Sequence, residues 1–143
     1  MAKIERTALV AYSAEQMFSL VNDIELYPQF MAGCTGAEVL ARGDGWLEAR
    51  LDLSRAGFKQ SFTTRNTLNP PHSMDLQLVA GPFSAFKGRW QFDALSESAC
   101  KITFSLEYEF ANKLLALAAG KIFEQVASEQ VSTLCERARQ VFV

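Results

Sequence analysis

The sequence predicts an α+β protein in which a seven-stranded antiparallel sheet wraps around a long C-terminal helix, with two short helices after the first strand. Apolar and polar residues alternate through much of residues 35–110, which is typical of strands with one buried face. Apolar residues then recur at helical spacing over 113–142. Short connections between successive strands favour an antiparallel meander. The chain has neither repeats nor linkers, so we expect residues 1–143 to form a single domain.

The N-terminal segment predicts one strand and two short helices. Residues 2–11 alternate imperfectly between apolar and polar types and are interpreted as a strand. Ser13 and Gln16 have the spacing of a capping box, in which each side chain bonds the backbone amide of the other residue. The helix that begins there should end near Asn22. Pro28 should close the second short helix, because proline lacks the amide hydrogen that a helix needs.

Turn residues divide the middle of the chain into strands. Gly43-Asp44-Gly45 separates two apolar runs as a hairpin does, and Ala56-Gly57 marks the next turn. Pro70-Pro71 ends a further strand, since proline cannot donate to the hydrogen-bond ladder. Gly81-Pro82 breaks the pattern again. Apolar and polar residues alternate most regularly over residues 100–110, which predicts a strand with one solvent-exposed face and one buried face.

The C-terminal segment predicts one helix over residues 113–142, with Asn112 as its N-cap. Gly120 lies inside this helix, where glycine costs about 1 kcal/mol relative to alanine, so we expect a bend or close packing there. Only this helix is long enough to cover the buried face of the sheet. Because a strongly twisted sheet cannot close tightly along one helix, we expect an aromatic-lined pocket between them.

Composition excludes several classes of function. The net charge of −2 argues against a general nucleic-acid binder, DNA included, though not against a local basic patch. The only histidine, His72, follows two prolines in a turn. A zinc cluster of cysteines and histidines is therefore excluded, and a Ser-His-Asp triad would have to use this one loop residue. Three widely spaced cysteines, Cys34, Cys100 and Cys135, suit a reducing compartment. Without a signal peptide or membrane span, we expect a cytoplasmic protein with no metal site and no catalytic residues.

Two motifs resemble a known family. The run from Phe18 to Cys34 contains Tyr27-Pro28-Gln-Phe30-Met-Ala-Gly-Cys34, and a second block joins Gly81-Pro82-Phe83 to Gly88-Arg89-Trp90-Gln91-Phe92. Both resemble the START-like polyketide cyclase and lipid-transport superfamily. The closer match is its branch of bacterial ribosome association toxins and the mitochondrial coenzyme-Q-binding protein. The resemblance covers the whole chain. Ala11 and Ala32 stand where the family usually has proline, which affects local rigidity rather than the fold.

This resemblance implies a helix-grip fold with a hydrophobic cavity and a function without catalysis. Our first hypothesis is a binding protein for ubiquinone or a similar prenylquinone, which carries it between the membrane and respiratory enzymes. No other cofactor is expected. The alternative is a toxin-like interaction protein that binds the large ribosomal subunit and blocks subunit association. A polyketide cyclase is the third hypothesis. It would need an acid or base inside the cavity, where the strands place mostly apolar groups.

The candidate cavity residues lie on the buried faces of the expected strands and C-terminal helix. A prenyl chain needs only an apolar slot, whereas its quinone head needs hydrogen-bond donors. Gln60, Thr64, Trp90 and Tyr108 are the candidate donors. An ordinary packed core would use the same residues, and that alternative stays open. The full set is Tyr27, Phe30, Met31, Gln60, Phe62, Thr64, Trp90, Phe92, Phe104, Tyr108, Ile122, Phe123 and Val126.

The segment Tyr27-Pro28-Gln-Phe30-Met31 has two interpretations. Pro28 fixes a turn, which would place Phe30 and Met31 at the pocket mouth as a gate or as a tip that touches a membrane transiently. A hydrophobic plug under the loop fits the same residues.

Basic residues gather in the strand region. Lys59, Arg65, Lys87 and Arg89 are usual on a solvated sheet face that acidic residues balance. If the four share one exposed face, they would form a patch for ribosomal RNA or anionic lipid. If the partner is anionic lipid, we expect part of the protein to be bound peripherally at the inner membrane.

Overall fold

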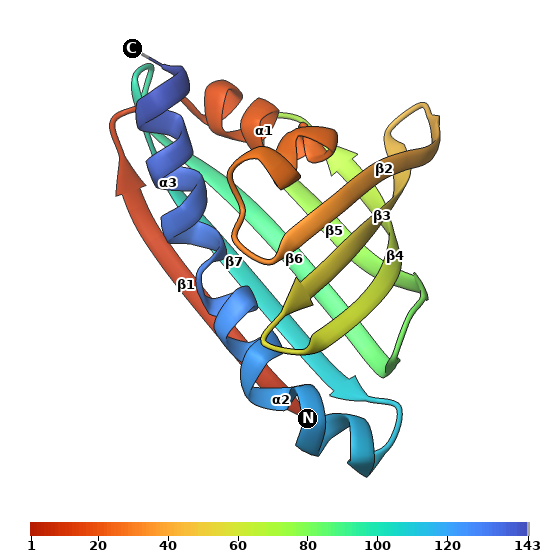
Figure 1. Ribbon diagram of the computed structural model, residues 1–143. Helices are drawn as coiled ribbons and strands as arrows, with labels where there is room; N and C mark the ends of the chain where they lie inside the picture. The colour runs from red at the N-terminus through yellow and green to blue at the C-terminus, as the bar shows by residue number, and fades with distance from the viewer. Residues whose placement is uncertain (143) are drawn as a thin grey trace.

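The computed structural model describes residues 1–142 and contains the predicted order of strands and short helices (Figure 1). A strand opens the chain, an α-helix and a 3-10 helix follow, and six strands precede the C-terminal helices. The elements are β1 (Ala2–Val10), α1 (Ala14–Asn22), η1 (Ile24–Gln29), β2 (Cys34–Gly43), β3 (Trp46–Arg55), β4 (Phe58–Asn69), β5 (Ser73–Ala80), β6 (Phe83–Ser96), β7 (Ala99–Phe110), α2 (Lys113–Ser128) and α3 (Gln130–Val141).

The seven strands form one antiparallel sheet in the order β1-β7-β6-β5-β4-β3-β2. The first strand therefore pairs with the last, and β2 lies at the opposite edge. The sheet curls, and the helices lie across its concave side (Figure 1). Alternation along each strand sends one set of side chains toward the helices and the other set to solvent. The predicted helix-grip fold is confirmed.

The start of the chain folds as its capping residues predict. The amide of Gln16 donates to Oγ of Ser13 at 3.1 Å, and the amide of Ser13 donates to Oε1 of Gln16 at 2.9 Å. η1 contains Pro28, and the phenol of Tyr27 donates to the backbone carbonyl of Val21. This buried hydrogen bond fixes η1 against the end of α1.

The prediction of one helix over 113–142 is wrong. Two helices, α2 and α3, meet at Glu129 (Figure 1). Asn112 caps α2 as predicted, since its side chain accepts the amide of Leu115 at 2.9 Å. Gly120 lies within a continuous part of α2 and marks no break.

At the break between α2 and α3, a side chain replaces one backbone donor. In an unbroken helix the carbonyl of Val126 would accept the backbone amide of Gln130. Here the side-chain amide of Gln130 donates to that carbonyl at 3.0 Å. The junction lets α2 contact β4 while α3 contacts α1. Among residues 1–142, none of the helices combines the length and the apolar character needed to cross a bilayer.

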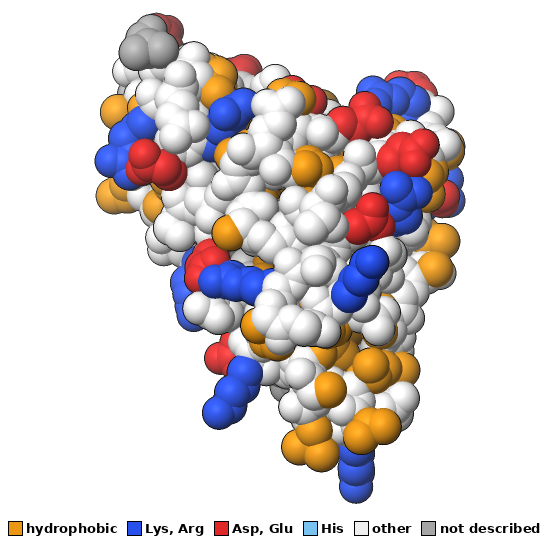
Figure 2. Space-filling model, in the orientation of Figure 1, with side chains coloured by type: hydrophobic (Ala, Val, Ile, Leu, Met, Phe, Trp, Pro, Cys, Tyr) orange, Lys and Arg blue, Asp and Glu red, His pale blue; other side chains and the backbone are white. Residues whose placement is uncertain are grey.

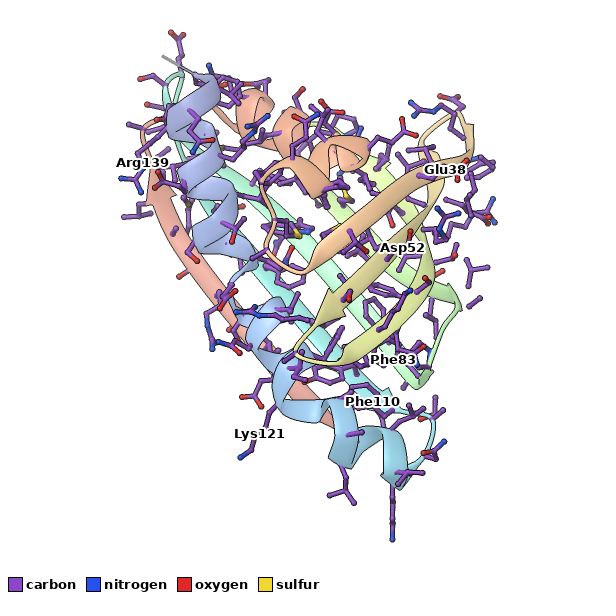
Figure 3. All side chains as sticks on the ribbon, in the orientation of Figure 1. Glu38, Asp52, Phe83, Phe110, Lys121 and Arg139 are labelled. Atoms are coloured by element: carbon purple, nitrogen blue, oxygen red, sulfur yellow. The ribbon has the colours of Figure 1, made fainter. Side chains whose placement is uncertain are left out.

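The core on the concave side has two parts. Under α1 and α3 it is fully packed, and Met17, Phe92 and Leu134 are at most 1% exposed. At the other end lies a cluster of aromatic rings, in which Phe83 stacks on Phe110 with centroids 5.1 Å apart (Figure 3).

Candidate ligand-binding cavity

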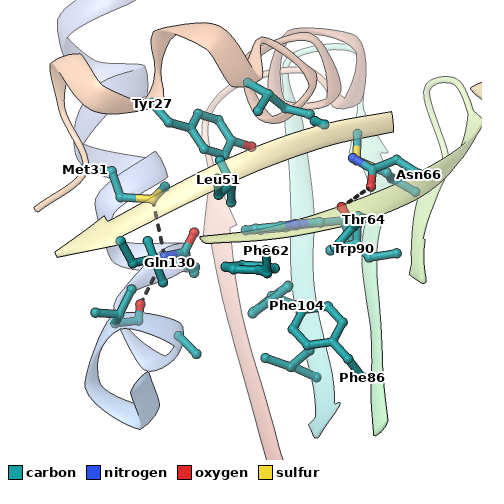
Figure 4. A pocket seen from close by; sticks show the side chains of 18 of the residues that line it. Tyr27, Met31, Leu51, Phe62, Thr64, Asn66, Phe86, Trp90, Phe104 and Gln130 are labelled. Carbon is teal, nitrogen blue, oxygen red and sulfur yellow. Dashed lines mark hydrogen bonds between the residues drawn. The ribbon is translucent and has the colours of Figure 1, made fainter. Parts of the chain in front are cut away.

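A cavity of about 90 Å³ lies between the concave face of the sheet and the helices (Figure 4). Strands β3 to β7, η1 and the loop after it, and the junction of α2 with α3 form its walls. Pockets for drug-sized ligands usually hold about 300–1,000 Å³, so a ligand of that size requires the walls to move apart. The lining is Ile24, Tyr27, Met31, Ala49, Leu51, Leu53, Phe62, Thr64, Asn66, Met74, Leu76, Phe86, Trp90, Phe104, Leu106, Phe123, Val126, Ala127 and Gln130.

Most of the predicted cavity residues lie on this lining. Trp90 and Phe104 form its aromatic centre, with ring centroids 4.6 Å apart. Their role in binding a ligand stays a prediction. The predicted residues that the structure brings together here are Tyr27, Met31, Phe62, Thr64, Trp90, Phe104, Phe123 and Val126.

Two predicted aromatic residues lie elsewhere because neighbouring side chains cover them. The ring of Phe30 lies 5.0 Å from the guanidinium carbon of Arg137 on α3 and is outside the cavity lining. Phe92 shares the inward face of β6 with Trp90 but packs edge-on against Phe18 of α1 at 5.5 Å. Both residues belong to the packed parts of the protein.

Three further predicted residues are also outside the lining. Tyr108 packs edge-on against Phe123 at 4.8 Å, within the aromatic cluster. Burial raises the pKa of its phenol. Gln60 and Ile122 are half-buried and do not border the cavity. Gln60 and Tyr108 are therefore poor candidates for donors to a quinone head.

The prediction missed lining residues on β3. Leu51 pairs with Phe62 of β4, and Ala49 pairs with Thr64, so these residues share the inward face. The alternation of apolar and polar residues along β3 could have identified Ala49, Leu51 and Leu53 as inward-facing. No pattern marked Asn66 or Gln130, which are single polar positions. The missed residues are Ile24, Ala49, Leu51, Leu53, Asn66, Met74, Leu76, Phe86, Leu106, Ala127 and Gln130.

One end of the cavity carries a buried polar pair. The hydroxyl of Thr64 donates to Oδ1 of Asn66 at 2.8 Å, and Nδ2 of Asn66 contacts the sulfur of Met74 at 3.8 Å (Figure 4). A thioether is a weak acceptor, and the amide group has two hydrogens to donate. Asn66 therefore offers a donor to an oxygen atom of a bound molecule.

The other end is closed by a side chain from the helix junction. Nε2 of Gln130 contacts the sulfur of Met31 at 3.4 Å while it also donates to the carbonyl of Val126 (Figure 4). This contact joins the loop after η1 to the start of α3. The cavity thus has a mainly apolar middle, with the pair Thr64 and Asn66 at one end and Gln130 at the other.

Among the described residues, the phenol of Tyr27 is the one titratable side chain of the lining. Within residues 1–142, no carboxylate, histidine, lysine or arginine borders the cavity. Burial raises the pKa of Tyr27, so its phenol stays protonated and continues to donate to the Val21 carbonyl. Burial also raises the pKa of the Cys34 thiol, and it raises that of Cys100 to about 11. Within residues 1–142, no three potential metal-ligating side chains come together.

The predicted basic set lies on the outer face of the sheet, where acidic side chains are interleaved with it. Arg89 pairs with Asp75 at 2.9 Å, and Arg65 pairs with Glu48 at 3.9 Å. Arg65 also lies 4.1 Å from the ring of Trp46. Lys59 and Lys87 are exposed and form no ion pair with any described residue.

Comparisons with known sequences identify relatives along the entire chain. The chain is 48% identical over 142 residues to ribosome association toxin RatA of Escherichia coli K12, covering 99% of this chain and 90% of that protein. It is 46% identical over 142 residues to ribosome association toxin RatA of Vibrio cholerae, covering 99% of both. The mitochondrial coenzyme Q-binding protein COQ10 of Drosophila melanogaster is more distant, at 24% identity over 92% of this chain and 56% of that protein.

Solved structures share the fold. The Zhui aromatase/cyclase of Streptomyces sp. R1128 superposes with a TM-score of 0.85 at 16% identity, over 99% of this chain and 96% of that one. A START superfamily protein from Mycobacterium smegmatis gives a TM-score of 0.81 at 26% identity, over 97% and 98%. The model of the family "Polyketide cyclase / dehydrase and lipid transport" matches residues 10–135. The chain therefore belongs to this family, and it is a START-like protein with a cavity for a hydrophobic ligand.

Proposed function

We propose that this protein is a ribosome association factor that binds the large ribosomal subunit in the cytoplasm and hinders subunit joining. The observation that carries the proposal is the 48% identity to E. coli RatA along 99% of the chain. This reverses the order of our two hypotheses, because the similarity to the coenzyme Q-binding protein is only 24%.

A binding role fits the chemistry of the chain. The cavity lining holds no ionisable acid or base other than the buried phenol of Tyr27, so the protein would act by occupying a surface. Lys59 and Lys87 are candidate contacts to ribosomal RNA phosphates, because both ammonium groups are free of ion pairs among the described residues. Arg65 and Arg89 would contribute less, since acidic partners already neutralise them.

Sucrose gradients with purified ribosomal subunits test this proposal. Added protein should reduce the peak of joined ribosomes, increase both free subunits, and sediment with the large one. An unchanged profile would contradict the proposal. The variant Lys59→Glu/Lys87→Glu should weaken the effect, whereas Lys101→Glu, at an exposed lysine near the start of β7, serves as the control.

The second candidate function is the binding of a prenylquinone or a similar lipid. The apolar cavity with a donor at Asn66 carries it, supported by the distant similarity to the coenzyme Q-binding protein. Organic extraction of the protein from a quinone-producing bacterium, followed by mass spectrometry, tests this function. A stoichiometric prenylquinone is expected, and an empty cavity or a random mixture of lipids would contradict it.

A cyclase activity is the weakest candidate. The Zhui aromatase/cyclase is only 16% identical to this chain. This similarity supports a shared fold and gives no support for a shared reaction. The absence of a carboxylate or histidine from the lining leaves no positioned base for that reaction.

A further inference from the structure

The first turns of α2 carry the two most exposed large hydrophobic side chains among the described residues. Leu114 is 78% exposed and Leu117 is 85% exposed. Figure 2 shows hydrophobic side chains gathered at this end of the molecule. Isolated exposed leucines are common on protein surfaces, but neighbouring ones on a single helix mark a surface that binds something apolar.

Lysines flank these leucines on the same side of the helix. Lys113, Leu117 and Lys121 follow one another at intervals of four residues, and Leu114 lies beside them. No acidic residue occurs between Glu109 and Glu124. Neither lysine forms an ion pair with any described residue. We call Lys113, Leu114, Leu117 and Lys121 the α2 tip.

The α2 tip adjoins the aromatic end of the core. Phe110 ends the strand that leads into α2, and its ring stacks on that of Phe83. Phe83 contacts Phe123 of α2 at 5.0 Å, and Phe123 lines the cavity. Figure 3 shows Phe83, Phe110 and Lys121 at this same end of the protein. Apolar side chains therefore continue from the cavity toward the α2 tip.

We propose that the α2 tip docks the protein on an anionic phospholipid bilayer. The leucines would enter the acyl region, and the lysines would contact headgroup phosphates, as in helices that lie in a membrane interface. A bilayer accounts for both kinds of side chain, because it presents apolar chains below a layer of negative charge. Ribosomal RNA would account for the lysines alone. This surface is separate from the outer sheet face assigned to the ribosome and from the loop of Phe30 and Met31.

Sedimentation with vesicles tests the docking surface. The protein should bind vesicles of phosphatidylcholine and phosphatidylglycerol, and bind pure phosphatidylcholine more weakly. The variant Leu114→Gln/Leu117→Gln should bind mixed vesicles at least about tenfold more weakly, because it removes the apolar area. Glutamine keeps the helix propensity high. Leu95→Gln, at the end of β6 and 59% exposed, is the matched control and should bind as the wild type does.

Charge reversal separates the contribution of the lysines. Lys113→Glu/Lys121→Glu should lose the preference for phosphatidylglycerol and the salt dependence of binding, while Lys101→Glu should keep both. The proposal is overturned if the wild type binds neither type of vesicle, or if the leucine variant binds as the wild type does. It is also overturned if the leucine and control variants lose binding equally. Ribosome profiles of the same variants should match the wild type. A variant that loses only its effect on ribosomes would assign the α2 tip to the ribosome instead.

Discussion

Arg55 and Glu129 join the hairpin between β3 and β4 to the junction of α2 and α3, with Nη1 3.1 Å from Oε2. Their side chains are only 30% and 39% exposed. Gly33 lies beside both Arg55 and Val126 of the cavity lining, since a Cβ atom at this glycine would lie 3.5 Å from Arg55 Cδ and 3.7 Å from Val126 Cγ2. The ion pair therefore connects two parts of the chain that lie close to the cavity, and we expect them to separate when a ligand enters.

Breaking this ion pair should speed ligand entry at little cost in stability. Glu129→Gln should lower the free energy of unfolding by less than about 1 kcal/mol, because partly exposed ion pairs contribute little. Stopped-flow uptake of a hydrophobic dye should become faster. Glu136→Gln removes the exposed pair with Arg139 on α3 and should leave uptake unchanged. The exchange Arg55→Glu/Glu129→Arg should restore slow uptake, and failure to do so would contradict this role of the pair.

Filling the cavity should abolish binding of a large ligand. Val126→Trp places an indole in a space of about 90 Å³, so affinity for a prenylquinone should fall at least about tenfold. Val141→Trp, near the end of α3 and 45% exposed, controls for the added ring. Thermal unfolding establishes that both variants fold. Undiminished affinity in a folded Val126→Trp variant would place the ligand elsewhere.

The polar pair Thr64 and Asn66 should select ligands that carry a carbonyl group. Thr64→Val/Asn66→Leu removes both partners, which avoids leaving one buried polar group unsatisfied. The variant should bind a prenylquinone about fivefold more weakly, equivalent to about 1 kcal/mol, and bind a hydrocarbon of similar length as before. Calorimetric titration of both ligands measures this difference. Thr67→Val, on the outward face of β4, is the control. Equal losses for both ligands would indicate a packing defect.

The sequence predicted the faces of the strands better than the shape of the cavity. Alternation assigned Trp90 and Phe92 to the same inward face, and both are buried. Only Trp90 borders the cavity, because α1 brings Phe18 against Phe92. Contacts between elements distant in the chain decide such differences, and periodicity within one strand carries no information about them.

The helix break shows a second limit. Asn112 is a common N-cap type, so the start of α2 was predictable. The junction at Glu129 contains neither glycine nor proline, and its neighbour Gln130 has a high helix propensity. The break coincides with the side-chain bond from Gln130 to Val126 and with a change of packing partners, since α2 contacts β4 and α3 contacts α1, and neither feature can be read from helix propensity. At Gly120, where we expected a bend or close packing, α2 continues as a regular helix and a Cβ atom would meet no atom within 4 Å.

The hydrogen bond from Tyr27 to the Val21 carbonyl should affect stability and its pH dependence. Tyr27→Phe should lower the free energy of unfolding by about 1–3 kcal/mol at neutral pH, because the carbonyl loses its partner. The folded state holds the phenolic proton more tightly than the unfolded state, since burial raises the pKa above its ordinary value of 10.0. The contribution of the Tyr27 phenol to the free energy of unfolding is therefore complete below pH 10.0 and decreases as the pH rises above that value.

Urea unfolding at neutral pH and above pH 10 measures this effect. Wild-type stability should decrease more steeply with pH than that of Tyr27→Phe, by up to about 1.4 kcal/mol per pH unit for one proton. The variant provides the reference, because other groups titrate equally in both proteins. Parallel pH profiles would show that Tyr27 ionises in the folded state as readily as in the unfolded state.

Gly120 and Gly81 should respond in opposite directions to substitution by alanine. A Cβ atom at Gly120 would meet no atom within 4 Å, and this position lies inside α2, so Gly120→Ala should stabilise the protein by about 0.5–1 kcal/mol. A Cβ at Gly81 would lie 2.7 Å from Cβ of Phe62, which lines the cavity. Gly81→Ala should therefore destabilise the protein by about 1–3 kcal/mol, because the turn or the ring must shift. Urea midpoints measure both changes. A destabilised Gly120→Ala variant would show that α2 needs flexibility at this position.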